Sequence, residues 1–121
     1  MGNFRDLILY QKAFENAMMI YNISKTFPKE EKFSLTAQIR DSSRSVCSCT
    51  SEAYRKRRYV KNWISKLSDA DMENSETIDW LDFANTCEYI SRDVYLDMIN
   101  RYEETGRLIN YYSENPSKFI R

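Results

Sequence analysis

Basic side chains crowd one short stretch of the sequence, and their types and spacing suit them to bind phosphate groups. The stretch is flanked by Tyr54 and Tyr59 and contains Arg55, Lys56, Arg57, Arg58 and Lys61. Such a cluster can bind phosphates by releasing counterions, and the tyrosine rings could stack on unpaired bases. The stretch therefore predicts a nucleic-acid contact. The alternative is that these are solvated surface charges that pair with nearby acids.

Two more arginines extend the predicted contact. Arg40 and Arg44 are four residues apart, so they share one face of a helix. The charge is also segregated along the chain although the net charge is zero. Residues 36–66 hold eight Lys or Arg and two acids, whereas residues 67–104 hold eleven acids and two Arg. A protein with no net charge can therefore still present a basic surface.

Carboxylates form the second group that could do chemistry. Asp69, Glu73 and Glu76 lie along one helical face. Helix bundles that bind paired metals through carboxylates also use Glu-x-x-His pairs, and this chain has no His. We therefore predict no metal site, and an acidic face that is solvated or forms salt bridges between subunits.

No arrangement typical of nucleophilic catalysis is found. Cys47 and Cys49 have no His to lower a thiol pKa, and with the distant Cys87 they are too few to hold zinc. The many serines between positions 42 and 51 also lack a His, and no Gly-rich loop could cradle a phosphate. The sequence therefore predicts no enzymatic activity, no catalytic residues and no cofactor, with the cysteines as small core residues.

The overall composition predicts an all-α protein with one domain over residues 1–121. Two Gly and two Pro among 121 residues are too few for the turns of a hairpin-rich β fold. No apolar run reaches 18 residues, so we expect no membrane span. Charged residues interrupt the apolar N-terminal stretch, which does not resemble a signal peptide, and we predict a cytoplasmic location.

The apolar periodicity predicts four helices. The first spans about residues 4–26 and has two apolar stripes. One stripe is Phe4, Leu7, Phe14, Met18 and Tyr21, and the other is Tyr10, Ala13, Ala17 and Ile20. Two stripes predict that this helix is buried on more than one side. A second helix is expected after Pro28, with a heptad seam of Leu35, Ile39, Ser42, Val46, Cys49 and Ala53. Its many small residues would let a neighbouring helix approach closely.

The third helix is expected from about Tyr59 to Cys87. Its predicted core stripe is Val60, Ile64, Leu67, Asp71, Asn74, Ile78 and Leu81. A second stripe could be core or a subunit contact, and we assign its large side chains to an interface: Met72, Trp80 and Phe83. Ser91 is a good N-cap for a fourth helix, which Asn115 and Pro116 should end.

Several segments together resemble a known family. They include Phe4-Arg5-Asp6-Leu7 with Tyr10-Gln11-Lys12-Ala13, Phe27-Pro28-Lys29-Glu30-Glu31-Lys32-Phe33, Gln38-Ile39-Arg40, Ser51-Glu52-Ala53-Tyr54, Glu76-Thr77 with Trp80-Leu81, and Tyr89-Ile90-Ser91. The ordered set resembles the four-helix bundle proteins encoded in intervening sequences of bacterial 23S ribosomal RNA genes. That family includes the accessory variability determinant of diversity-generating retroelements.

The resemblance carries expectations about fold and partners. It implies an up-down four-helix bundle in a ring-shaped homo-oligomer, typically a pentamer. It also implies a basic surface for structured RNA or DNA, and for some relatives a reverse transcriptase as partner. The hypothesis is a non-catalytic bundle that binds nucleic acid through Arg40, Arg44, Arg55, Lys56, Arg57, Arg58 and Lys61. The alternative is a protein-interaction module or accessory subunit with no direct nucleic-acid role.

Overall fold

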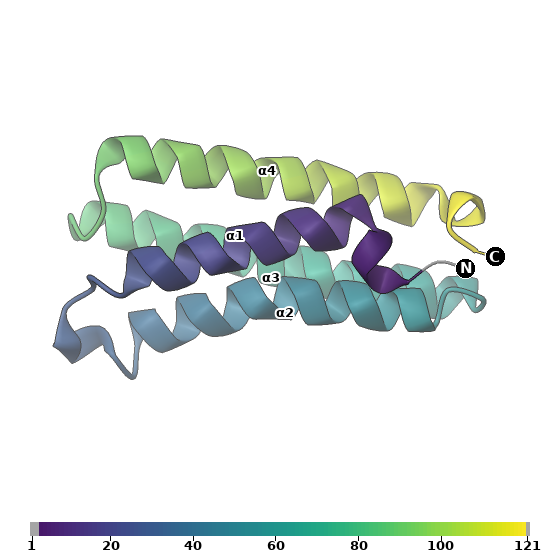
Figure 1. Ribbon diagram of the computed structural model, residues 1–121, viewed down its shortest axis with the longest axis horizontal. Coiled ribbons are helices and arrows are strands. Elements are labelled where there is room, and N and C mark those ends of the chain that lie inside the picture. The colour runs from purple at the N-terminus through teal and green to yellow at the C-terminus, as the bar shows by residue number, and fades with distance from the viewer. Residues whose placement is uncertain (1–2, 121) are drawn as a thin grey trace.

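The computed structural model describes residues 3–120, which form an up-down bundle of four helices (Figure 1). These are α1 (Ile8–Ser24), α2 (Leu35–Arg55), α3 (Val60–Thr86) and α4 (Arg92–Glu114). Three short 3-10 helices accompany them, at Phe4–Asp6, Lys29–Glu31 and Pro116–Lys118, and no strand occurs in this part of the chain. The predicted all-α four-helix bundle is therefore confirmed. Among these helices, none has the length and apolar character needed to cross a bilayer.

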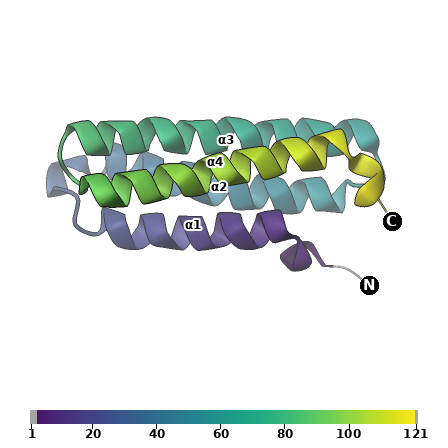
Figure 2. The ribbon, with the colours of Figure 1, turned by 90° about the horizontal axis from the view of Figure 1, so that it is seen from above.

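The helices lie around the core in chain order. Figure 2 shows α1 and α3 on opposite sides of the molecule, with α2 and α4 between them. The turn between α2 and α3 lies at the same end as the two ends of the described chain, on the right in Figure 1. The α1–α2 connection and the α3–α4 turn lie at the other end. This topology places the basic stretch at one end of the bundle.

The first helix begins later than the periodicity predicted. Phe4–Asp6 is a separate 3-10 helix, Leu7 is extended, and α1 starts at Ile8. The cause is a capping box, in which the Asn3 side chain accepts a bond from the Arg5 N–H (2.9 Å) and the Asp6 carboxylate accepts one from the Asn3 N–H (3.1 Å). Phe14 and Met18 are about half exposed, so within one chain α1 is buried on one side only.

The predicted boundaries of α3 and α4 are confirmed to within a residue or two, but the core stripe of α3 was partly wrong. The buried series is Trp63, Leu67, Ala70, Asn74, Thr77, Leu81 and Ala84. Val60, Ile64 and Asp71 are exposed instead. The series includes the small residues Ala70, Thr77 and Ala84, and α3 makes its most extensive contact with α2, whose buried side also holds many small residues. The Ser91 side chain caps α4 by accepting from the Val94 N–H (3.2 Å), as predicted.

The core consists of two apolar clusters with a polar layer between them. The cluster towards the α2–α3 turn includes Leu9, Val46 and Trp63, and the cluster at the other end includes Ile20, Ile39 and Leu81. The layer between them contains the buried side chains of Asn16, Ser42, Asn74, Thr77 and Thr105.

Hydrogen bonds across this polar layer join three helices. The Thr77 hydroxyl of α3 donates to the Ser42 hydroxyl of α2 (2.8 Å). The Thr105 hydroxyl of α4 donates to the Asn74 side-chain oxygen (2.7 Å), and the Asn74 amide donates to the Tyr102 carbonyl (2.8 Å). Because a shifted helix would leave these buried groups unpaired, the layer fixes the register of α2, α3 and α4.

The buried hydroxyl of Tyr102 gives a first testable prediction. Tyr102 is 1% exposed, and its hydroxyl has no hydrogen-bond partner within residues 3–120. An unpaired buried hydroxyl costs free energy, so we expect Tyr102→Phe to leave the stability unchanged or to raise it by up to about 1 kcal/mol. Urea denaturation followed by circular dichroism measures this. A loss above about 1 kcal/mol would mean that the hydroxyl has a partner in solution.

Candidate nucleic-acid interface

The predicted basic stretch is a tight turn between two long helices, and we call Arg55, Lys56, Arg57, Arg58 and Lys61 the basic turn. α2 ends at Arg55 and α3 begins at Val60. The Arg57 N–H donates to the Tyr54 carbonyl (3.2 Å), and the Tyr59 N–H donates to the Lys56 carbonyl (2.9 Å). These bonds concentrate the five cations at one end of the bundle, where four of them are exposed and Arg57 is half-buried.

Aromatic rings orient two of these cations. The Arg57 guanidinium lies 4.0 Å from the centroid of the Tyr54 ring and also donates to the Tyr54 carbonyl (3.0 Å). Arg55 lies 5.8 Å from the centroid of the Phe4 ring, and Arg5 lies 4.6 Å from the same ring. Arg5 is thus a basic residue of this surface that the sequence pattern did not reveal, because only the folded 3-10 helix brings it next to α2.

The acids do not neutralise the basic turn. Lys66, one helical turn beyond it, pairs with Glu52 (3.6 Å) and Asp69 (3.8 Å). Within residues 3–120, none of the seven cations predicted to bind nucleic acid forms an ion pair. The alternative in which these cations pair with the acids of α3 therefore applies to Lys66 but not to the basic turn.

Arg40 and Arg44 form a separate group. Their guanidinium groups lie 4.8 Å and 5.9 Å from the centroid of the Tyr21 ring, and the Lys25 ammonium lies 4.8 Å from it. Arg40 also donates to the buried Ser24 hydroxyl (2.7 Å). We call Tyr21, Lys25, Arg40 and Arg44 the Tyr21 cluster. Arg44 and Arg55 are eleven residues apart on α2, or roughly 16 Å, so the structure does not merge the two basic groups.

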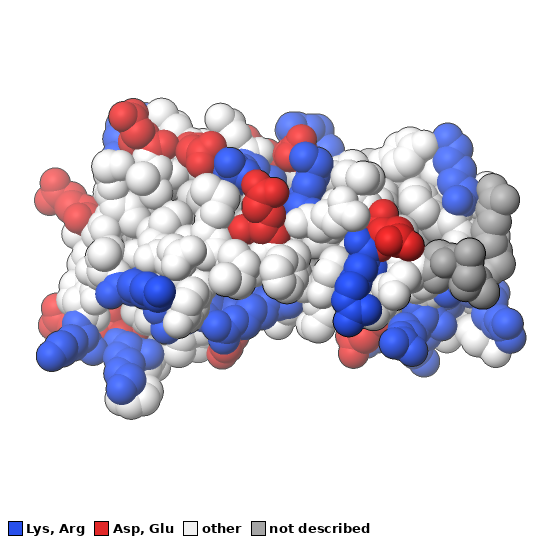
Figure 3. All heavy atoms as spheres, viewed as in Figure 1, with Lys and Arg blue, Asp and Glu red and all other residues white. Residues whose placement is uncertain are grey.

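The surface charges agree with this division. Figure 3 shows Lys and Arg side chains along the lower half of this face, over α2, and at the end that holds the α2–α3 turn. The upper part of the same view, over α4, holds acidic side chains with Lys and Arg side chains among them. The lower half is thus the more uniformly basic part of this face.

The acidic residues of α3 are not arranged like a metal site. Glu73 has a raised pKa, first because it is partly desolvated and then because Glu76 and Asp69 repel its charge. Within residues 3–120, no three His, Cys, Asp or Glu side chains gather in a way that could hold a metal ion.

The cysteines differ in their surroundings. Cys47 is buried, Cys49 is half-buried and Cys87 is exposed. Burial raises the pKa of the Cys47 thiol to about 12. Burial, followed by the negative charges of Glu52, Asp69 and Glu73, raises the pKa of Cys49 to about 11. Both therefore remain thiols at neutral pH, and neither has the low pKa of an activated nucleophile.

The residues predicted to form an interface lie outside the core. Met72 is 68% exposed and Phe83 is 58% exposed, whereas Trp80 is half-buried. Trp80 and Phe83 border an open cleft of about 390 Å³ with Phe33, which is 87% exposed. Glu31 lines the same cleft, and hydrogen bonds from Ser34, then from Tyr89 and from the Leu35 N–H, lower its pKa.

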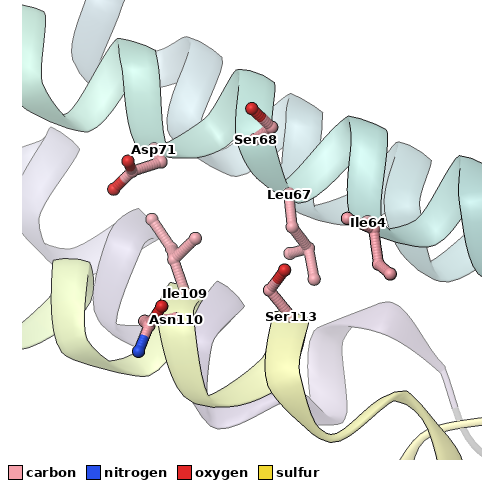
Figure 4. Close-up of a pocket in the computed structure, with 7 residues that line it drawn as sticks. All are labelled: Ile64, Leu67, Ser68, Asp71, Ile109, Asn110 and Ser113. Carbon is pink, nitrogen blue, oxygen red and sulfur yellow. The ribbon is translucent and has the colours of Figure 1, made fainter.

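A second groove of about 270 Å³ separates α3 from α4. Figure 4 shows Leu67 and Ile109 pointing into the space between the two helices. Asp71 is the one ionisable side chain that lines this groove. It therefore has no partner there for acid–base chemistry.

Comparisons with known proteins agree with the resemblance drawn from the sequence. A family model described as 23S rRNA-intervening sequence protein matches residues 5–111. A crystal structure of a protein of unknown function from the S23 ribosomal protein family of Bacteroides thetaiotaomicron VPI-5482 is similar in fold. Its TM-score is 0.80 at 30% sequence identity, over 88% of this chain and 96% of the other. No curated protein matches the chain.

Proposed function

The chain belongs to the family of 23S rRNA-intervening sequence proteins, and we propose that it is a non-catalytic, cytoplasmic, homo-oligomeric bundle that binds RNA or other nucleic acid through its basic turn. The observation that carries the proposal is that five cations share one turn and none has an acidic partner among the described residues. Phosphate groups would supply the missing negative charge. The homo-oligomer, with a pentamer as the form to expect, comes from the resemblance.

The geometry of the turn suits nucleic acid better than a free anion. Arg57 is held against Tyr54, so it gives up less side-chain freedom when it binds a phosphate. Tyr59 is 59% exposed beside the cations, where its ring can stack on an unpaired base. Repetition of the turn around an oligomer would multiply a weak contact into a useful affinity.

Binding of nucleic acid is tested by fluorescence anisotropy with a structured RNA and a matched DNA duplex, at low and moderate salt. We expect binding that weakens steeply with salt. Changing Arg55, Lys56, Arg57 and Arg58 to Ala should then abolish binding at moderate salt. On duplex DNA, the slope of log affinity against log salt should become shallower by about 0.9 for each phosphate that the variant no longer neutralises.

The matched control removes the same charge elsewhere. Lys29, Lys32, Arg92 and Arg107 are cations outside the basic turn, and changing all four to Ala alters the net charge equally. We expect this variant to keep most of the affinity. An equal loss in both variants would indicate a general charge effect, and no binding by the unaltered protein at low salt would contradict the proposal.

A second candidate function is a protein-interaction module, for example an accessory subunit of a reverse transcriptase. The exposed cleft beside Phe33, Trp80 and Phe83, next to the acids of α3, favours it. It would become the leading proposal if neither nucleic acid binds.

A further inference from the structure

The outer side of α1 is apolar and has no partner within the described chain. Phe14 is 51% exposed and Met18 is 47% exposed. They border an open groove of about 220 Å³ on the side facing α2, together with Tyr10 and Tyr21. The cations of the Tyr21 cluster lie beside the groove, and Arg44 lines it. We call Phe14, Met18, Tyr21, Lys25 and Arg44 the basic face.

The outer side of α3 has the opposite charge. Met72 and Phe83 are exposed, and the Trp80 and Phe83 rings lie 5.9 Å apart. No Lys or Arg occurs between positions 67 and 91, so no cation from this part of α3 neutralises its acids. We call Met72, Glu76, Asp79, Trp80 and Phe83 the acidic face.

The two faces cannot meet within one chain. Figure 2 shows α1 and α3 at opposite sides of the bundle, and the other two helices separate them. Each face has large apolar side chains exposed to water, which is unusual for a surface with no partner. Opposite charge beside these side chains makes the two faces complementary to each other, while two copies of the same face would repel.

We propose that the basic face of one copy packs against the acidic face of a second copy. This inference rests on the homo-oligomer in the proposed function, and it names the surfaces that join the copies. Because the two surfaces differ, the contact is head-to-tail, and repetition leads to a closed ring or an open filament. In this arrangement Arg44 lies in the contact between copies and does not bind nucleic acid, which the basic turn binds instead.

The spacing of residues along the helices supports this pairing. Helices α1 and α3 run in the same direction (Figure 1). Met18 and Lys25 are seven residues apart near the C-terminal end of α1. Met72 and Asp79 on α3 are also seven residues apart. A second copy related by rotation about an axis parallel to the helices therefore presents an apolar residue and then an acid in the same order and at the same spacing. Because Asn16 and Asn74 lie at one level, the pair on α3 is offset by about four residues, or roughly 6 Å, towards the α2–α3 turn.

Charge reversal tests this pairing, measured by light scattering after gel filtration and without nucleic acid. We expect the unaltered protein to be larger than one chain. The Lys25→Glu/Arg44→Glu variant and the Glu76→Lys/Asp79→Lys variant should each be monomeric, because each places like charges across the contact. In a mixture, the Lys side chains introduced in the second variant face the Glu side chains introduced in the first variant. The unaltered acidic face of the first variant then faces the unaltered basic face of the second. Because the two variants must alternate, which a five-membered ring does not allow, the mixture should form pairs, open chains or even-numbered rings that are larger than one chain.

Each result decides between the possibilities. A monomeric unaltered protein, single variants that assemble normally, or a mixture of folded variants that stays monomeric would each overturn the pairing. Circular dichroism and thermal unfolding verify that both variants are folded. The variant with the basic turn changed to Ala should assemble normally, so loss of nucleic-acid binding with assembly intact would support both proposals. Normal assembly without any nucleic-acid binding by the unaltered protein would contradict the proposed function alone.

Discussion

The Trp63→Ala variant is expected to lose about 3–5 kcal/mol of unfolding free energy, as is typical when a buried Trp is removed. Trp63 is fully buried and fills the cluster next to the α2–α3 turn. Its ring is nearly parallel to that of Tyr112, with centroids 6.3 Å apart, and lies 5.4 Å from that of Phe119. Its indole N–H donates to the Tyr112 carbonyl (3.0 Å). The change therefore leaves a cavity and removes a buried hydrogen bond.

Urea denaturation followed by circular dichroism, at one fixed protomer concentration, measures this loss. Tyr111→Ala is the matched control, because Tyr111 contacts Phe119 in the same cluster but is 44% exposed. We expect the control to lose about 1 kcal/mol or less. If Trp63→Ala lost no more unfolding free energy than the control, the C-terminal segment would not pack against α3 as described.

Asn74→Asp is expected to cost about 3 kcal/mol or more at neutral pH, because it buries a carboxylate with no cation beside it. Asn74 is 3% exposed, and its amide donates to the Tyr102 carbonyl. The substitution keeps the size of the side chain but removes this donor. It therefore tests the chemistry of the polar layer, not its packing.

The same substitution predicts a definite pH dependence. Burial raises the pKa of the introduced carboxyl above its unfolded value of about 3.9. Below that value both states are protonated, and the penalty is smallest. As pH rises from the unfolded pKa to the folded pKa, the unfolded state releases its proton first, so the loss of stability grows. Above the folded pKa the penalty is constant.

The stability difference from the unaltered protein is measured by urea denaturation at about pH 4.5 and about pH 7.5, the first close to the unfolded pKa and the second near neutrality. Asn100→Asp, at an exposed position of α4, is the control and should show little difference at either pH. A penalty for Asn74→Asp that is equal at both pH values would mean that water reaches this part of the core.

The order of the helices and the ends of α4 could be predicted because they depend on local signals. Ser91 and Pro116 mark these ends through capping and backbone geometry, which act within a few residues. The start predicted for the second helix was wrong, because Pro28 begins only the 3-10 helix Lys29–Glu31 and α2 starts at Leu35. The break at Leu7 also has a local cause, the Asn3–Asp6 capping box, but apolar periodicity alone does not detect it. The register of α3 is harder to predict, because Ala70 and Ala84 are buried for their small size while the larger Val60 and Ile64 remain exposed.

The candidate site was predictable to a similar extent. The basic turn is contiguous in the sequence, so its clustering follows from the chain alone. Arg40 and Arg44 gather around Tyr21 on α1, away from the basic turn. Their position depends on how α1 and α2 pack together. The position of Arg5 beside Phe4 and Arg55 likewise requires the folded N-terminal segment. Periodicity within one helix contains no information about such neighbours.

The polar layer between the two apolar clusters has a consequence for how the bundle opens. Apolar contacts couple the residues within each cluster, whereas the layer joins the clusters through a few directional bonds. We therefore expect native-state amide exchange to reveal two cooperative units with different opening free energies, one on each side of Asn74 and Thr105. The half with the α2–α3 turn could then loosen around a ligand while the other half stays closed.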